Sequence, residues 1–167
     1  MKGDKYKNLR VYRDKGLIDD WYIKEFEKNH NCCLPKNYKH LVSKHNCVRF
    51  YQDYFDFVNF KGEKGIRNFI FKGFGEKEDI SEHIEDVQLH VSHPDYYGLP
   101  GIVAFASTGE GDMVCFDYRD NLKSCEPRII LMIHDEYITH EDESVTMVIE
   151  FIANSFDEFL NILYEDD

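Results

Sequence analysis

"FIANSFDEFLNILYEDD", residues 151–167, joins an apolar run, a polar turn and the start of a helix. Ser155 is a favourable N-cap because its hydroxyl can accept a hydrogen bond from a free N–H of the first helical turn. Glu158 completes a Ser-x-x-Glu capping box three residues later. The residues that then recur on one helical face are Phe156, Phe159, Leu160 and Leu163. The sequence therefore predicts a final helix with a buried apolar stripe. Burial of each large side chain is expected to stabilise the fold by about 2 kcal/mol.

Two helices are predicted near the N-terminus. Asp19 or Asp20 can cap a first helix that runs to about Asn29. A second helix opens at Leu34-Pro35, because proline is well tolerated in a first helical turn, and fades near Asn46.

The middle of the chain has mainly the period of strands. Aromatic and β-branched residues with partial alternation predict strands in residues 49–60, 66–74, 100–120, 127–136 and 144–153. The Gly-rich turn at residues 108–111 predicts a hairpin. Helical spacing returns once, over residues 78–90, which predicts a short third helix.

This order of elements predicts an α+β domain with a largely antiparallel sheet, flanked by N-terminal helices and a C-terminal helix. The last helix is expected to pack on a face of that sheet. A chain of 167 residues with 43% hydrophobic residues is most simply one domain with a packed core. We place a basic N-terminal segment at residues 1–16 and the domain at residues 17–167.

Targeting signals are missing from the sequence. No wholly apolar run is longer than five residues, as in Ile129–Ile133, and this is far too short to span a membrane. The N-terminus is charged and lacks the apolar segment of a secretory signal. We therefore predict a cytoplasmic protein that does not contact membranes.

Charge is distributed unevenly along the chain, whose net charge is −12. The first sixteen residues hold six Lys or Arg against two Asp, a local charge of +4, which leaves −16 for the remaining 151 residues. Such an acidic body repels nucleic-acid phosphates and attracts a basic protein. The alternative is that the acidity only keeps the protein soluble.

The cysteine pattern shows no metal or disulfide frame. The five cysteines are Cys32, Cys33, Cys47, Cys115 and Cys125, an odd number without a CxxC pair. We predict reduced thiols, several of them packed in the core, and no structural zinc.

Short motifs resemble catalytic patterns but lack their full frame. Gly109-x-Gly111 is a weak phosphate-loop signal, because Glu110 and Asp112 beside it would oppose an anion and no helix follows. Ser107 lacks the GxSxG context of a nucleophile elbow. We predict that the protein is not an enzyme and uses no cofactor.

Two polar segments contain residue types that bind metals. They are His90, His93 and Asp95 in "HVSHPDYY" and the histidines and carboxylates of "HDEYITHEDE" (residues 134–143). Neither spacing is HExxH or another known ligand frame, so no metal site is predicted.

Carboxylates gather around two predicted turns. One group surrounds the 108–111 hairpin, and "HDEYITHEDE" holds five carboxylates in ten residues. We predict a docking face for a basic protein, with Glu110, Asp112, Asp135 and Glu136 as the contact residues. The alternative is a solvated charged edge that prevents aggregation between strands.

Four motifs occur in the order found in SUKH-superfamily domains of the SMI/KNR type, which the chain resembles over residues 18–164. The opening I-x-x-F-E and L-P-x-x-Y motifs, with the L and N that follow, are matched by Ile23, Phe26, Glu27, Leu34, Pro35, Tyr38, Leu41 and Asn46. The middle segment is matched by Leu99, Pro100, Gly111, Asp112, Cys115 and Asp117, and the next turn by His134-Asp135-Glu136. The closing I-A-x-S-F-x-x-F-L motif is matched by Ile152, Ala153, Ser155, Phe156, Phe159 and Leu160. Cys47 departs from the family's usual glycine, and Asp112 from its common asparagine.

The resemblance implies an α+β fold with an antiparallel sheet and flanking helices. It also implies a function, because most bacterial members are cytoplasmic immunity proteins that bind and neutralise polymorphic or contact-dependent toxins, often nucleases. We therefore expect an antitoxin whose partner is a basic protein toxin. The alternative is a non-catalytic scaffold or regulatory module, as in the fungal cell-wall regulators of the family.

Overall fold

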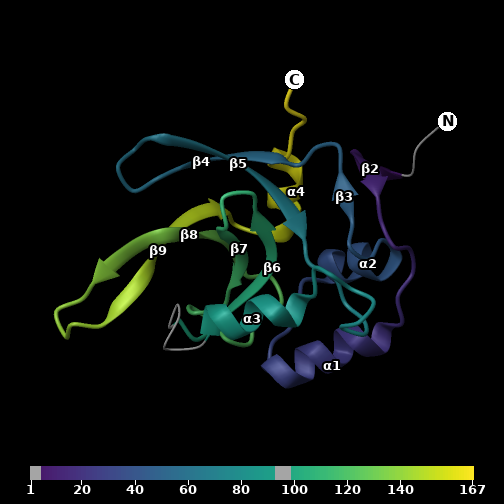
Figure 1. Cartoon of the computed structure of the whole chain (residues 1–167), viewed down its shortest axis with the longest axis horizontal. Helices are drawn as coiled ribbons and strands as arrows, with labels where there is room; N and C mark the ends of the chain where they lie inside the picture. Colours follow the sequence, from purple (N-terminus) through teal and green to yellow (C-terminus); the bar gives the residue numbers. More distant parts are fainter. Residues whose placement is uncertain (1–4, 93–98) are drawn as a thin grey trace.

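A six-stranded antiparallel sheet is the largest element of the structure, a computed structural model that describes residues 5–92 and 99–167 (Figure 1). Its strands are β4 (Tyr54–Val58), β5 (Lys64–Phe71), β6 (Ile102–Thr108), β7 (Met113–Asp117), β8 (Arg128–Thr139) and β9 (Val145–Ala153). The strands follow chain order across the sheet, and every neighbouring pair is antiparallel. The predicted α+β class and the largely antiparallel sheet are confirmed.

A second, three-stranded sheet forms at the N-terminus. It contains β1 (Lys5–Tyr6), β2 (Leu9–Arg13) and β3 (Arg49–Phe50). Two of these strands lie in the basic segment of residues 1–16, and its side chains Tyr6 and Leu9 are buried in the main core. Over its described residues, this segment is therefore packed into the domain.

Four helices surround the sheets: α1 (Asp20–His30), α2 (Lys36–Lys44), α3 (Ile84–Ser92) and α4 (Phe156–Ile162). The two N-terminal helices begin where the sequence predicts. The Asp19 side chain caps α1 by accepting the N–H of Trp21 at 2.9 Å, and α2 follows Pro35 directly.

The third helix begins later than predicted, at Ile84, and ends at Ser92. The expected first helical turns are replaced by two short turns, at residues 77–79 and 81–82, after which His83 forms a parallel bridge with Gly73. The Gly73 N–H donates to the Glu82 carbonyl at 2.7 Å, and the Ile84 N–H donates to the Gly73 carbonyl at 2.9 Å. These tertiary hydrogen bonds replace the helical ones that local spacing would favour.

The helices cover the two faces of the sheet unequally. Helices α1, α2 and α4 contribute to a large aromatic core, which includes Tyr38, Phe105, Phe116 and Phe156. Helix α3 crosses the other face, over a smaller cluster around Val91 (Figure 1). Successive strand residues therefore alternate between two apolar layers.

The final helix is capped and packed as predicted. The Ser155 Oγ accepts the Glu158 N–H at 3.1 Å, and the Glu158 carboxylate accepts the Asn154 N–H at 2.9 Å. The return bond thus reaches the residue before the N-cap. Phe156, Phe159 and Leu160 are buried in the large core, so α4 closes that side of the sheet.

The sheet curls so that its first and last strands approach each other. In the turn after β4, the Phe60 N–H donates to the Glu150 carboxylate of β9 at 3.2 Å. The outer edge of β4 pairs with Tyr164, through backbone hydrogen bonds of 3.1 and 3.0 Å between Tyr54 and Tyr164.

Two cysteines form a disulfide, so the prediction of reduced thiols is wrong for this pair. Cys33 follows α1 and Cys125 lies in the β7–β8 loop, with their Cα atoms 4.8 Å apart. A sequence separation of 92 residues offers no local signal of this pairing. The other three cysteines are free, with Cys115 buried and Cys32 and Cys47 half-buried.

Candidate functional site

The two acidic segments singled out in the sequence lie against each other. Gly111, in the β6–β7 turn, has φ +91°, and a Cβ added there would come within 3.3 Å of the His134 ring. The Asp112 carboxylate accepts the backbone N–H of His134 at 2.6 Å. Segments that are 22 residues apart in the chain therefore form one surface.

A bulge in β8 takes residues 134–136 out of the regular pairing with β9. Met132 pairs with Ile149 and Tyr137 pairs with Met147, so β8 contains three more residues than β9 over this stretch. Asp135 takes a left-handed conformation with φ +64°, which aspartate tolerates better than most residues. The bulge exposes residues 134–136 instead of burying alternate side chains.

Three of the four predicted contact residues present their carboxylates to solvent. Glu110, Asp135 and Glu136 are all exposed, and they come from the β6–β7 turn and the β8 bulge. Glu110 is 3.7 Å from the guanidinium of Arg67, and Asp135 is 3.2 Å from the ring of His134. We call these three carboxylates the acidic face.

Asp112 is placed differently from the other three, and its assignment as a contact residue is corrected. It is only 2% exposed, and its carboxylate accepts from Arg67 Nε at 2.6 Å as well as from the His134 backbone. A buried carboxylate with these partners cannot reach another protein. Its role is to join the hairpin turn, β5 and the bulge under the acidic face.

Arg67 is the residue of this region that sequence reasoning missed. It projects from β5, bonds Asp112, lies near Glu110 and stacks over the Phe57 ring at 5.2 Å. Because buried carboxylates need paired cations, an arginine was to be expected beside Asp112. The sequence could not say which one, since residue 67 is on another strand.

A small cavity of about 120 Å³ extends the acidic face toward the β4–β5 hairpin. Its lining includes Glu63, Glu136 and Glu150, together with Lys61 and Arg67. Phe60, another lining residue, is 69% exposed. The cavity therefore places carboxylates beside an exposed apolar side chain.

The carboxylate at the other end of β7 is part of the structure. Asp117 is buried and accepts hydrogen bonds from Arg119 Nε at 2.8 Å and from Arg128 Nε at 2.7 Å. Burial alone would raise the pKa of Asp117, but the bonds from these arginines outweigh it and lower the pKa to about 2. This carboxylate stays ionised and paired inside the fold.

The free cysteines lack the character of nucleophiles. Burial raises the pKa of Cys32 to about 12, raises that of Cys47 and raises that of Cys115 well above its ordinary value. These thiols therefore stay protonated at neutral pH.

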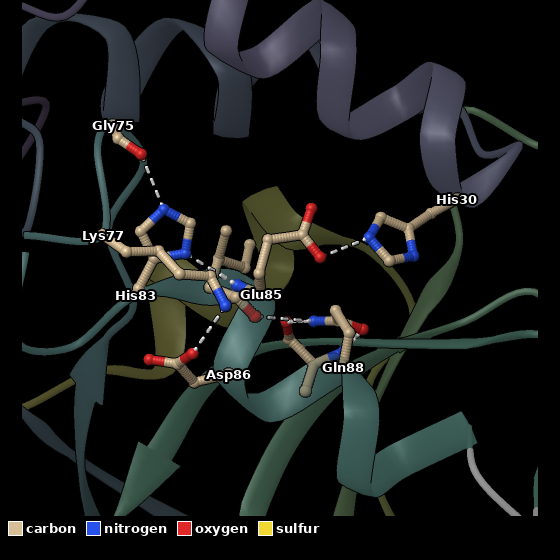
Figure 2. A network of polar contacts seen from close by, with 9 residues as sticks. His30, Gly75, Lys77, His83, Glu85, Asp86 and Gln88 are labelled. Atoms are coloured by element: carbon tan, nitrogen blue, oxygen red, sulfur yellow. Dashed lines mark hydrogen bonds and ion pairs between the residues drawn. The ribbon is translucent and has the colours of Figure 1, made fainter.

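A polar network at the start of α3 contains two histidines that the sequence analysis did not single out (Figure 2). The ring of His83 lies 2.7 Å from the Gly75 carbonyl through Nε2, while its Nδ1 accepts the Glu85 N–H at 3.1 Å. Figure 2 also shows His30 beside Glu85, with 2.8 Å between Nε2 and the carboxylate. The His83 ring therefore links the first turn of α3 to the Gly75 carbonyl.

Metal-binding geometry is absent from residues 5–92 and 99–167, where no three His, Cys, Asp or Glu side chains converge. The side chain of His90 and the whole of His93 and Asp95 lie outside the described residues. No helix in the same ranges has the length and apolar character needed to cross a membrane.

The structure is thus an α+β domain with three exposed carboxylates gathered on one surface. The model of the SMI1/KNR4 family (SUKH-1) matches residues 17–162, so the chain belongs to this family. No curated protein and no solved structure matches the chain.

Proposed function

We propose that this protein is a cytoplasmic immunity protein that binds and neutralises a basic protein toxin such as a nuclease. Membership of the SUKH-1 family supports the proposal, since such domains often serve as immunity proteins. The observation that carries it furthest is the acidic face, where two separate segments bring three exposed carboxylates together.

Neutralisation by this surface needs binding and no turnover. A basic toxin is drawn to the acidic face by long-range attraction, which speeds association and makes it sensitive to salt. The buried Arg67–Asp112 pair holds the face in place from below. The protonated thiols of the free cysteines support a stoichiometric inhibitor rather than a thiol enzyme.

A growth experiment tests the function. The toxin-like product of a neighbouring gene is expressed with and without this protein, and growth is recorded. We expect wild-type protein to restore growth and to copurify with the toxin at a fixed ratio. A hydrolytic activity that is lost on substitution of one His or Cys, with folding intact, would show an enzyme instead.

A kinetic experiment tests the surface. In the variant Glu110→Lys/Asp135→Lys/Glu136→Lys, we expect association with the toxin to slow by about ten-fold or more at low salt, and to lose most of its salt dependence. Asp112 is left unchanged, because it holds the fold together.

A matched control carries the same change of charge elsewhere. The exposed carboxylates Glu78, Glu126 and Asp167 form no ion pair with another described residue, and they lie outside the acidic face. Their replacement by lysine should alter association much less. Equal slowing in both variants would mean that only net charge matters and would remove the acidic face from the proposal.

A further inference from the structure

A second cavity, of about 340 Å³, lies beside the small sheet and is lined by three basic side chains. They are Arg13 of β2, Lys15 just after it and Arg49 of β3. In Figure 1 this sheet is at the side of the molecule away from the β8–β9 hairpin. A protein of net charge −12 therefore gathers cations at one place.

Arg13 and Arg49 are directly opposite each other in the ladder between β2 and β3. Like charges at directly opposed positions of a sheet destabilise it. Within the described part of the chain, neither guanidinium has an ion pair or hydrogen bond. The pair is thus an unfavourable arrangement for the protein alone.

The remaining arginines show how unusual this pair is. Each has a carboxylate partner, in the pairs Arg10–Glu165, Arg67–Asp112, Arg119–Asp117 and Arg128–Asp117. Asp53 acts on Arg49 only from a distance, and the pKa of Asp53 is raised because burial outweighs that attraction. The two unpaired arginines of the described chain therefore face one cavity.

The acidic residues of the cavity wall are already engaged. Asp14 contacts His45 Nδ1 and accepts the Gly16 N–H at 3.0 Å, and Glu82 pairs with Lys72. They do not neutralise the two guanidinium groups. With three cations in its lining and both carboxylates already engaged, the cavity keeps a positive character that suits an anion.

We propose that this cavity binds the phosphate group of a small phosphorylated ligand. Guanidinium groups form bidentate, charge-assisted hydrogen bonds with oxyanions, and two of them beside an ammonium suit a phosphate dianion better than a single carboxylate. The volume is in the range of small-molecule sites. Ile70 and Phe71 supply an apolar wall for the rest of the ligand.

Inorganic phosphate is the probe for the test. Calorimetric titration at constant ionic strength compares phosphate with acetate and chloride, using the purified full chain. We expect phosphate to bind, and Arg13→Gln/Arg49→Gln to weaken its binding by about ten-fold or more. The charge-matched control Lys28→Gln/Lys123→Gln, on exposed residues outside the cavity, should bind phosphate as the wild type does.

Thermal unfolding gives a second, independent measurement. Phosphate should raise the melting temperature of the wild type more than that of Arg13→Gln/Arg49→Gln, since the variant binds phosphate more weakly. Without phosphate, the double variant should be at least as stable as the wild type, because the like-charge contact is gone. If the double variant does not fold, Arg13→Lys and Arg49→Lys take its place, since each keeps the charge and loses the fork.

Three results would overturn the proposal. They are an equal response to phosphate, acetate and chloride, an unchanged phosphate affinity in the arginine variants, and tighter binding of acetate than of phosphate. The last would assign the cavity to a carboxylate-bearing ligand. None of these results bears on toxin binding, because the cavity and the acidic face share no residue.

Discussion

The two ends of β7 carry carboxylates that have opposite roles. At its last residue and just beyond, the fold is stabilised by Asp117 with its two arginines, by the Cys33–Cys125 disulfide and by the Tyr118 hydroxyl, which donates to the Cys33 carbonyl at 2.6 Å. Before its first residue, the β6–β7 turn meets the β8 bulge and exposes the acidic face. Carboxylates thus stabilise the fold where they are buried and paired, and remain available for binding where they are exposed.

The largest effect on stability is expected in the aromatic core. Leu160 of α4 is 3% exposed in the aromatic core. Leu160→Ala should lower the free energy of unfolding by about 2–5 kcal/mol, because it removes buried apolar surface and leaves a cavity. Denaturant melts with a constant m-value measure the loss, and a harmless substitution would show that α4 is not packed on the sheet.

Reducing the disulfide near the Asp117 end of β7 should lower the free energy of unfolding nearly as much as Leu160→Ala does. Cys33–Cys125 closes a loop with a sequence separation of 92 residues, so its reduction is expected to lower stability by about 2–4 kcal/mol. Thiol titration of the unfolded protein should count three thiols before reduction and five after it. Cytosolic proteins rarely retain disulfides, so the proposed location requires that the reduced protein stays folded.

Acid should weaken the same end through Asp117. Because its pKa in the folded protein, about 2, is below the ordinary 3.8, its stabilisation is complete above the ordinary value. It is lost as the pH falls from about 4 toward 2, by about 2 kcal/mol in total. Urea melts across this range should show that acid lowers the free energy of unfolding less in Asp117→Asn than in the wild type. At neutral pH the variant should be the less stable of the two. Parallel pH profiles would contradict this account of the Asp117 network.

The smallest effect on stability is expected at the acidic face. Glu110→Lys/Asp135→Lys/Glu136→Lys should lower the free energy of unfolding far less than Leu160→Ala, because all three side chains are exposed. Replacing exposed neighbouring carboxylates also relieves repulsion. A loss of stability as large as that of Leu160→Ala would show that the acidic face stabilises the fold, as the Asp117 end of β7 does.

Local chemistry in the sequence was sufficient to predict much of the fold. The caps at Asp19 and Ser155 depend on neighbouring backbone atoms, so they could be predicted without knowing the tertiary structure. The hairpin turn at residues 108–111 is equally local, and the Gly111 N–H donates to the Thr108 carbonyl at 3.1 Å. The period of the apolar residues then separated strands from helices.

The features that the sequence did not reveal depend on distant partners. Asp112 differs from Glu110 because Arg67 of β5 and the His134 N–H of β8, both distant in sequence, bind its carboxylate in the interior. The disulfide joins two loops that are 92 residues apart in the chain, and the β8 bulge becomes visible only in its register with β9. Nearness of acidic residues in sequence therefore predicted an acidic region, but could not separate its contact residues from its supports.

The curl of the large sheet also bears on how copies of this protein behave together in a crowded cell. Free strand edges are templates on which a second chain can extend a sheet, and this is a common route to aggregation. Here Tyr164 occupies the edge of β4 at Tyr54, and Glu150 places a charge where β9 approaches the β4–β5 turn. These contacts leave less of the β4 and β9 edges open, which lowers the tendency of two copies to pair through them.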